Sequence, residues 1–344
     1  MKAIRLTGIK QTELVDLPAP TIRHPHHVLL KLEKVGVCGS DVHYYATGRI
    51  GSQIVQYPFI VGHECSAVVV ETGRDVRNLK PGQLVAVDPA MVCHECDQCR
   101  QGRENTCRKL RFLGCPGQSE GCLCEYIVMP ADCLFPVANP VTADRAALAE
   151  PLSIGVYAVK QSRLPDAADV AVLGSGPIGL SVLLAAKADR AANVFVTDKI
   201  DSRGSVAKNA GATWAGNPDR LDAVKTILDQ RPAGMDVVYE CAGEQDTLDQ
   251  AVDLLKPGGR LMLIGIPRVE RVSFTIDRLR RKELTVTNVR RQNGCVHPAI
   301  DLIASGQIDV DFMVTHRFPL EKTQQAFDLV HDYRDGVVKA MIDF

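Results

Sequence analysis

Residues 170–186 read VAVLGSGPIGLSVLLAA, and this stretch decides the fold of the middle of the chain. The run carries no charged residue, and its length approaches that of a membrane span. Gly-Ser-Gly-Pro interrupts it, however, and such a turn is typical of a boundary between two elements of a globular domain. We therefore predict a buried strand, a tight turn and a helix.

The turn itself, residues 174–179, reads GSGPIG and fits the pattern G-x-G-x-x-G. The first glycine permits the tight turn, the second lets the backbone approach a pyrophosphate, and the third allows close packing of helix on strand. The free N–H groups at the start of the helix then face the phosphates. The pattern alone also describes an ordinary glycine-rich turn, but the flanking strand and helix favour dinucleotide binding. The predicted cofactor-binding residues here are Gly174, Gly176, Pro177, Ile178 and Gly179.

The next strand-like segment, NVFVT at 193–197, leads to Asp198, nineteen residues after Gly179. A carboxylate in this place accepts hydrogen bonds from the hydroxyls of the adenosine ribose. It also repels the 2′-phosphate of NADP, so we predict NAD as the cofactor. Lys199 and Arg203 bring positive charge nearby, which weakens this preference without reversing it. Arg203 joins the predicted cofactor-binding residues.

The alternation of strand and helix extends on both sides of the turn. Across residues 165–287 it predicts βαβ units and a doubly wound parallel sheet, a Rossmann domain of the α/β class. Earlier in the chain, short β-type runs separated by glycine and proline predict a strand-rich, partly barrel-like domain. We predict that a helix beginning near Pro151 joins the two. The predicted domains are 1–153 for the metal-binding part, 154–290 for the cofactor and 291–344 for a segment that returns to the first domain.

The overall composition excludes some classes of binding partner. Among 344 residues, 40 Lys and Arg balance 41 Asp and Glu, so nothing indicates electrostatic binding to nucleic acid or to an anionic membrane. The first twenty residues lack the apolar core of a secretory signal, and twelve cysteines without such a signal indicate a reducing compartment. We predict a cytoplasmic protein with a small-molecule substrate.

Residues 93–107, CHECDQCRQGRENTC, hold four cysteines spaced C-x2-C-x2-C-x7-C. Disulfides are the alternative, but a reducing compartment favours metal binding by clustered thiols. Thiolates at this spacing suit a closed, tetrahedral zinc site that a chain can wrap locally. His94 lies inside the motif, yet four thiolates already complete the tetrahedron. The predicted ligands of this structural zinc are Cys93, Cys96, Cys99 and Cys107.

A second set of possible metal ligands is dispersed along the chain. Cys38 lies in GVCGSDVHYY (36–45), His63 and Glu64 lie in VGHECSAVV (61–69), and Glu150 lies in AALAEPLS (146–153). Spacing alone does not bring these residues together. A buried thiol, a packed histidine and two solvated carboxylates would explain them equally well.

These motifs together resemble the zinc-dependent medium-chain dehydrogenases, and within them the sorbitol (L-iditol, xylitol) dehydrogenase branch. The resemblance covers the whole chain. It is carried by the Cys-Gly-Ser-Asp-Val-His-Tyr segment 38–44, Gly-Arg-Ile-Gly 48–51, Gly-His-Glu 62–64, the cysteine motif, Glu-Pro-Leu-Ser 150–153, the glycine turn and Arg-Arg-Gln-Asn 290–293. Animal sorbitol dehydrogenases lack the complete cysteine motif, so a bacterial-type polyol dehydrogenase is the closer model.

The resemblance implies a GroES-like first domain with a catalytic zinc held by Cys38, His63 and Glu64. Glu150 would be a fourth ligand or would hold the zinc-bound water, because a catalytic zinc needs an exchangeable position. A glutamate as the third ligand distinguishes this chain from alcohol dehydrogenases that use a second cysteine there.

The family's reaction is oxidation of a secondary hydroxyl of a sugar alcohol to a ketose, with hydride transfer to C4 of the nicotinamide. By resemblance, Ser40 would take up the proton and His43 would pass it toward solvent. A strand-end cap and a packed imidazole are the structural alternatives for these two residues. The residues that match positions lining the family's substrate pocket are Tyr44, Phe112, Glu150 and Arg290.

The sequence leaves alternatives open for the oligomeric state and for the substrate. The family commonly forms tetramers in which cofactor-domain sheets pair, and the strand-like segments GRLMLIG (259–265) and RVSFTI (271–276) are candidates for that contact, with a dimer as the alternative. A related zinc dehydrogenase acting on threonine, glucose or a sugar-alcohol phosphate is a second possible function. A non-catalytic NAD-binding protein on the same fold would tolerate loss of a zinc ligand, whereas here every ligand position is filled.

Overall fold

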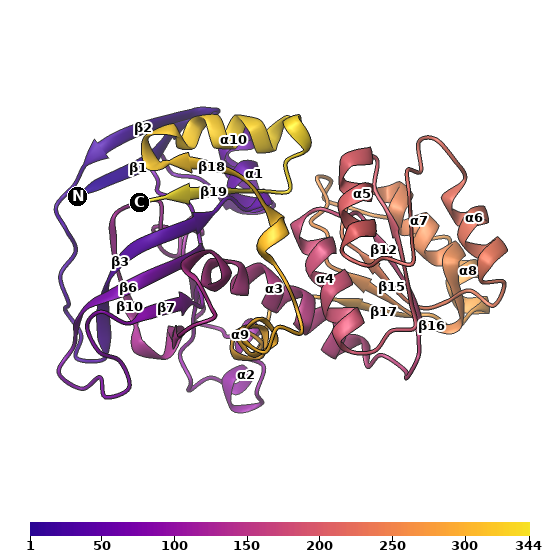
Figure 1. The fold of residues 1–344 in the computed structure, drawn as a ribbon, viewed down its shortest axis with the longest axis horizontal. Coiled ribbons are helices and arrows are strands. Elements are labelled where there is room, and N and C mark those ends of the chain that lie inside the picture. The colour runs from indigo at the N-terminus through magenta and orange to yellow at the C-terminus, as the bar shows by residue number, and fades with distance from the viewer. The chain divides into compact units, whose positions relative to one another are not determined.

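The computed structural model describes residues 1–344, and the chain forms two compact units (Figure 1). The first unit comprises Met1–Glu150 and Val296–Phe344, and the second comprises Pro151–Cys295. The chain therefore leaves the first unit once and returns to it for its last segment. None of the helices combines the length and the apolar character needed to cross a lipid bilayer.

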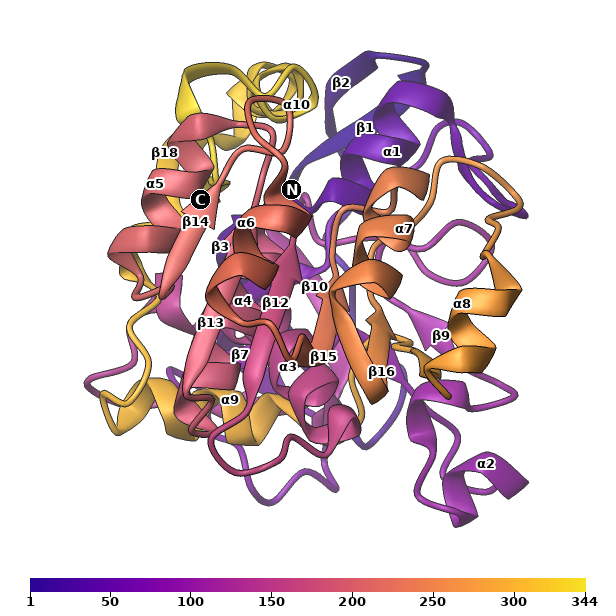
Figure 2. The same cartoon turned by 90° about the vertical axis from the view of Figure 1, so that its right-hand side faces the viewer.

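The second unit is built on a six-stranded parallel sheet in the order β14-β13-β12-β15-β16-β17. In chain order its strands are β12 (Asp169–Leu173), β13 (Asn193–Thr197), β14 (Trp214–Gly216), β15 (Met235–Glu240), β16 (Leu255–Leu263) and β17 (Thr285–Asn288). Counted from the first strand, this order is 3-2-1-4-5-6, that of a doubly wound Rossmann sheet, and Figure 2 shows the strands side by side. The predicted fold class of this part of the chain is confirmed.

Helices cover this sheet on both faces because the chain crosses from the edge strand β14 to β15, on the far side of β12, and then adds strands in the opposite direction. The helices are α4 (Pro177–Ala188), α5 (Asp201–Asn209), α6 (Ala223–Gln230), α7 (Gln245–Leu254) and α8 (Ile276–Arg281). In Figure 1, α4 and α5 lie on one side of the strands, and α6, α7 and α8 lie on the other. Strands that are covered on both faces carry apolar residues on both faces. Accordingly, Leu173, Phe195 and Val238 are buried in the core of this sheet.

The first unit is organised around β3 (His27–Gly36), which lies inside a seven-stranded sheet. One side of β3 pairs with β6 (Glu64–Thr72), and its other side pairs first with β10 (Tyr126–Pro130) and then with β19 (Lys339–Asp343). The last strand of the chain therefore completes the sheet of the first unit. The other members of this sheet are β7 (Leu84–Val87), β11 (Leu134–Pro136) and β18 (Val314–Pro319).

Short elements complete the first unit. Its remaining strands are β1 (Lys2–Gly8), β2 (Gln11–Asp16), β4 (Arg49–Ile50), β5 (Gln53–Ile54), β8 (Ala90–Met91) and β9 (Arg111–Phe112). Its helices are α1 (Gly39–Thr47), α2 (Asp97–Arg100), α9 (Val296–Ala304) and α10 (Thr323–His331), and α3 (Ala143–Ser162) begins here and continues into the second unit.

Two predictions about individual elements are wrong. The joining helix α3 begins at Ala143, not near Pro151, because Thr142 precedes it and accepts a hydrogen bond from the Arg145 backbone N–H (3.4 Å). Pro151 lies inside this helix. The segment RVSFTI forms no strand: it is irregular up to Ile276, where α8 begins, and β17 is the edge strand of the sheet. Its β-branched and aromatic residues favour a strand, but no neighbouring strand pairs with it.

Candidate metal centres and cofactor site

The four-cysteine segment is a small lobe whose ends are fastened together. Strands β8 and β9 pair antiparallel, Ala90 opposite Phe112 and Met91 opposite Arg111, so the residues between them form a closed loop. We call residues 93–107 the cysteine lobe. Helix α2 and a 3₁₀ turn at Glu104–Thr106 bend the backbone so that all four thiols face one point.

The sulfur atoms of the lobe have the spacing of a tetrahedral metal site. The Sγ–Sγ distances are 3.4 Å for Cys93–Cys107, 3.5 Å for Cys96–Cys99, 3.9 Å for Cys96–Cys107 and 4.0 Å for Cys93–Cys99. Four sulfurs at about 2.3 Å from one zinc lie about 3.8 Å apart. The thiols therefore fit a zinc ion without rearrangement.

The thiols of the lobe do not ionise equally on their own. Backbone N–H donors of Arg108 and Cys99 lower the pKa of Cys96 to about 6, whereas burial and the neighbouring thiols raise the pKa of Cys99 to about 12. A bound dication would stabilise all four thiolates together. His94 takes no part, since its Nε2 lies 2.6 Å from Asp132 Oδ2 and its Nδ1 lies 3.4 Å from Glu104 Oε1.

The dispersed residues Cys38, His63 and Glu64 meet in the interior of the first unit. One ligand atom of each lies within 4.8 Å of the ligand atoms of the other two. Cys38 caps the N-terminus of α1 just after β3, and His63 and Glu64 stand at the start of β6. We call these three residues the deep cluster. Its thiolate, imidazole and carboxylate are a donor set that suits zinc.

Asp41 holds His63 in place. The imidazole Nδ1 lies 3.3 Å from Asp41 Oδ1, which also accepts a hydrogen bond from the Gly62 backbone N–H (3.1 Å). A carboxylate on one ring nitrogen orients the other nitrogen toward a metal. Burial would lower the pKa of His63, but Asp41 and Cys38 together raise it well above its usual value. Zinc and protons therefore compete for this imidazole.

Glu64 is paired inside the protein with Lys339 of β19. The Lys339 ammonium lies 2.5 Å from Glu64 Oε2 and 3.1 Å from the Val37 carbonyl oxygen, and both side chains are 1% exposed. Burial would lower the pKa of Lys339, but Glu64, Cys38 and Glu150 raise it above its usual value. Contact with the Glu64 carboxylate therefore favours the ammonium form of Lys339.

Glu150 lies in the electrostatic reach of the deep cluster. It is 4% exposed, and its carboxyl is shifted to a pKa of about 7, mainly by burial. The charges of Glu64 and Asp88 raise this pKa further, while those of His63 and Lys339 lower it. A carboxylate so close to the cluster is a possible fourth donor, although it is absent from the group whose ligand atoms converge.

Of four other predicted residues of the first unit, Phe112 and Ser40 contact residues of the deep cluster, and His43 and Tyr44 lie on α1. Phe112, at the base of the cysteine lobe, packs against His63 with ring centroids 5.4 Å apart. Ser40 donates a hydrogen bond from its hydroxyl to Cys38 Sγ (3.3 Å). His43 is half-buried on α1, and the Tyr44 hydroxyl donates to Gln53 Oε1 (3.0 Å). Arg290 belongs to the second unit, where it is exposed after β17.

The glycine turn lies between β12 and α4, at the carboxyl end of the sheet where the strand order reverses. Gly174 has a φ of +94°, and a Cβ on Gly179 would lie 1.8 Å from the Gly174 carbonyl oxygen. Both positions therefore require glycine. The Nη1 atom of Arg203 lies 3.5 Å from where a Cβ of Gly176 would stand, so this side chain reaches the turn from α5.

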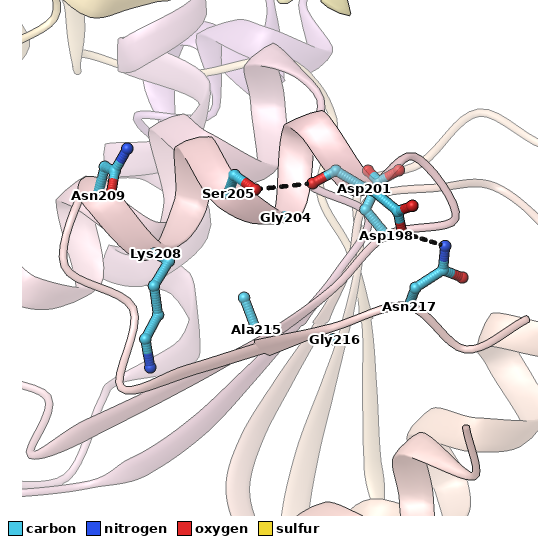
Figure 3. Close-up of a pocket in the computed structure, with 9 residues that line it drawn as sticks. All are labelled: Asp198, Asp201, Gly204, Ser205, Lys208, Asn209, Ala215, Gly216 and Asn217. Carbon is cyan, nitrogen blue, oxygen red and sulfur yellow. Dashed lines mark hydrogen bonds between the residues drawn. The ribbon is translucent and has the colours of Figure 1, made fainter. Parts of the chain in front are cut away.

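Asp198 is locked beside the turn by three hydrogen bonds. Its Oδ2 accepts from the Ser175 backbone N–H (2.7 Å) and hydroxyl (3.2 Å), and its Oδ1 accepts from the Ile200 backbone N–H (2.8 Å). Next to it, a cavity of about 450 Å³ opens between α5 and β14 (Figure 3). Its lining residues are Asp198, Asp201, Gly204, Ser205, Lys208, Asn209, Ala215, Gly216 and Asn217.

Sequence reasoning missed three residues of the deep cluster's surroundings. Asp41 stands three residues after Cys38 as the second half of a capping box, a pattern that could have identified it. Lys339 interrupts the apolar run VVKAMI (337–342), and a charge there is the signal of a buried partner. The need for glycine at Gly36 has no sequence signal, because it depends on what the neighbouring strands carry.

Comparisons with known proteins agree with this arrangement. Residues 24–139 match the alcohol dehydrogenase GroES-like domain, and residues 177–305 match the zinc-binding dehydrogenase domain. The sorbitol dehydrogenase of Bacillus subtilis is 35% identical over 345 residues, covering 99% of this chain and 97% of the relative.

Solved structures extend the likeness to the fold. A zinc-binding dehydrogenase from Sinorhizobium meliloti bound to NADP has a TM-score of 0.91 at 30% identity and covers 100% of this chain and 99% of its own. An alcohol dehydrogenase from Escherichia coli complexed with NADH has a TM-score of 0.92 at 28% identity, with the same coverage. The chain therefore belongs to the zinc-dependent medium-chain dehydrogenase family, in the branch of the sorbitol dehydrogenases.

Proposed function

We propose that this protein oxidises a secondary hydroxyl of a sugar alcohol to a ketose and transfers the hydride to NAD. The observation that carries the proposal is the deep cluster, where a thiol, an imidazole and a carboxylate from distant parts of the sequence converge within 4.8 Å. Three protein ligands leave a fourth position for water or substrate, as catalytic zinc sites do. A closed structural site would not need a buried, mixed donor set.

In this proposal the two clusters hold one zinc each, with different duties. Cys38, His63 and Glu64 hold the catalytic ion, and Glu150 is a fourth ligand or orients the water at the open position. The catalytic ion, when bound, supplies a Lewis acid that lowers the pKa of the substrate hydroxyl. The four cysteines of the lobe hold a structural ion that fastens residues 93–107.

Residues around the deep cluster bind the substrate and carry its proton. Ser40 takes up the proton, and its hydroxyl already lies 3.3 Å from Cys38 Sγ. His43, on the same helix and half-buried, passes the proton toward solvent. Phe112, beside His63, supplies an apolar wall, while Tyr44 and Glu150 bind other hydroxyls of the polyol. Arg290, which belongs to the second unit, is proposed as a further substrate-binding residue because it matches a family position of that role.

The cofactor proposal rests on Asp198, because the two solved relatives hold NADP in one case and NADH in the other. Asp198 lies against the glycine turn, where its charge repels a 2′-phosphate. Gly174, Gly176, Pro177, Ile178, Gly179 and Arg203 form the rest of the dinucleotide site. Asp198→Ser should raise the KM for NAD and lower that for NADP in steady-state assays. A wild-type enzyme that prefers NADP would contradict this role of Asp198.

The substrate class is tested by a panel. Reduction of NAD should be faster with sorbitol, xylitol or L-iditol than with threonine or glucose, and the panel also includes galactitol and inositol. The relative at 35% identity that is named sorbitol dehydrogenase supports sorbitol as a substrate. Faster turnover of threonine, glucose or a sugar-alcohol phosphate would assign the protein to another substrate class. No turnover of any alcohol by the zinc-loaded protein would contradict an enzymatic role.

We also propose assembly into a homotetramer through the sheets of the second unit, with a dimer as the alternative. The edge strand β17 leaves Val286 exposed, and Ile266, Val269 and Ile276 lie exposed in the preceding segment and at the start of α8. An apolar sheet edge is a template for pairing with another copy. Light scattering should give the mass of a tetramer, and a monomer would contradict the proposal. We propose a cytoplasmic location, which is supported by twelve cysteines that form no disulfide with one another.

A further inference from the structure

Lys339 has no part in the roles assigned so far, although it is the most deeply placed lysine of the protein. It is 1% exposed and lies 2.5 Å from Glu64 Oε2. Placing both charges of an ion pair in the interior costs free energy, and removing one partner leaves the other uncompensated. The partner here is a proposed metal ligand. The pair therefore bears on how the deep cluster holds its ion.

Three adjacent strands fix this pair in position (Figure 1). Gly36 of β3 stands opposite Glu64 of β6 on one side and opposite Met341 of β19 on the other. A Cβ on Gly36 would lie 2.5 Å from Glu64 Oε2 and 3.4 Å from Lys339 Cδ. Because Gly36 has no side chain, it leaves the space in which the Glu64 carboxylate and the Lys339 ammonium meet. The Val37 carbonyl, 3.1 Å from Nζ, adds a fixed acceptor.

The charges around the deep cluster are arranged for competition. Glu64 is the carboxylate in direct contact with Lys339, with Oε2 at 2.5 Å from Nζ, and both side chains are 1% exposed. A dication bound by Cys38, His63 and Glu64 would be attracted by the same Glu64 carboxylate and would be close to the buried ammonium. In low dielectric, two cations that share one anion repel each other strongly.

We propose that Lys339 is a resident cation that competes with zinc for Glu64 and so makes the deep cluster release its ion more readily. The inference rests on the proposed catalytic zinc. Lys339 is a positioning residue: it occupies Oε2 of Glu64 and neutralises the carboxylate whether or not the ion is present. Without Lys339, the carboxylate is neutralised by the ion alone, and the ion is held longer.

The test measures release of zinc from the zinc-loaded protein into excess chelator. Wild type should release two zinc ions per chain in two phases, one from each cluster. Lys339→Met should slow the deep phase by about tenfold or more, the scale typical of groups that contact a metal ligand. Lys339→Gln, which keeps a donor for the Val37 carbonyl without the charge, should also slow it and serves if Lys339→Met does not fold. The lobe phase is the internal control.

Two further variants isolate the charge. Lys34→Met removes a lysine that pairs with Asp343 (2.8 Å) between β3 and β19, away from Glu64, and should leave both phases unchanged. In a Glu64→Gln background loaded at high zinc concentration, so that the deep cluster is filled despite its weaker ligand, Lys339→Met should no longer slow release from the deep cluster, because the shared anion is gone. Unchanged or faster release from Lys339→Met and Lys339→Gln would overturn the role of Lys339. A wild type that binds only the lobe zinc would instead overturn the catalytic site on which the inference rests.

Discussion

The cysteine lobe and the deep cluster are built in opposite ways. The lobe takes four identical ligands from fifteen consecutive residues and closes on a two-stranded pair, β8 and β9. The deep cluster takes three different ligands from two distant turns, and a buried lysine from the last strand of the chain joins it. A local site can form wherever its segment folds, whereas a distributed site exists only when the sheet of the first unit is complete.

The surroundings of the two clusters differ as much as their ligands. Around the lobe, the charged groups are exposed and pair with one another, as Arg108 does with Asp97 (2.8 Å for Nη2–Oδ2). Around the deep cluster, Asp41, Glu150 and Lys339 are all buried. Buried charges act at high strength on a bound ion and on its ligands. This contrast favours chemistry at the deep cluster and a structural duty for the lobe.

The largest effect should come from removing the thiolate of the deep cluster. Cys38→Ser should lose one zinc per chain and reduce turnover by several orders of magnitude, because the Lewis acid leaves with its ligand. Metal analysis and steady-state kinetics measure both losses. Cys65→Ala is the matched control: Cys65 is buried two residues after His63 but lies outside the converging ligand group. Normal polyol oxidation by zinc-depleted Cys38→Ser would refute the zinc-dependent mechanism.

A cysteine-to-serine substitution in the cysteine lobe should affect stability more than chemistry. Cys99→Ser should lose the other zinc and lower the free energy of unfolding by several kcal/mol, since loss of a structural metal is among the largest effects of a single substitution. The deep zinc should stay. Thermal unfolding and metal analysis check this result, with His94→Ala as a control that leaves the four thiols intact. If Cys99→Ser kept two zinc ions and normal thermal stability, the lobe would not be a metal site.

Features formed by neighbouring residues could be predicted from the sequence, whereas features formed by residues far apart in the sequence could not. The glycine turn and the strands around it were recognisable because each signal lies within a few residues, and the observed parallel sheet confirms them. The convergence of Cys38, His63 and Glu64 needed the family resemblance, since pairing of β3 with β6 sets it. Lys339 needed the structure, because it reaches Glu64 from a strand 275 residues away in sequence. Side-chain partners across strands have no local pattern.

Substitutions of Glu64 and Glu150 should have different effects, because Glu64 is a proposed zinc ligand and Glu150 is proposed to act on the water. Glu64→Ala should lower zinc occupancy and turnover together, as expected for a direct ligand. Glu150→Ala should keep the zinc and lower turnover of polyols by about 10- to 100-fold, the range for groups that act on a metal through its ligands or water. Zinc content and kcat measured on the same preparations make the comparison. Loss of zinc from Glu150→Ala would make Glu150 a ligand in its own right.

The smallest effect is expected at Ser40, whose hydroxyl donates to Cys38 Sγ over 3.3 Å. Ser40→Ala should keep two zinc ions and normal NAD affinity, because it removes neither a ligand nor a part of the second unit. Turnover should fall by about tenfold, less than the usual contribution of a positioned acid or base, because water can replace a hydroxyl in a proton relay. The proton must then leave directly to solvent, so the rate should rise with pH over a wider range than in wild type. Ser40→Gly provides a second hydroxyl-free variant and should show the same profile. An unchanged pH–rate profile in both variants would leave Ser40 only as a hydrogen-bond donor to Cys38, with the proton taking another route.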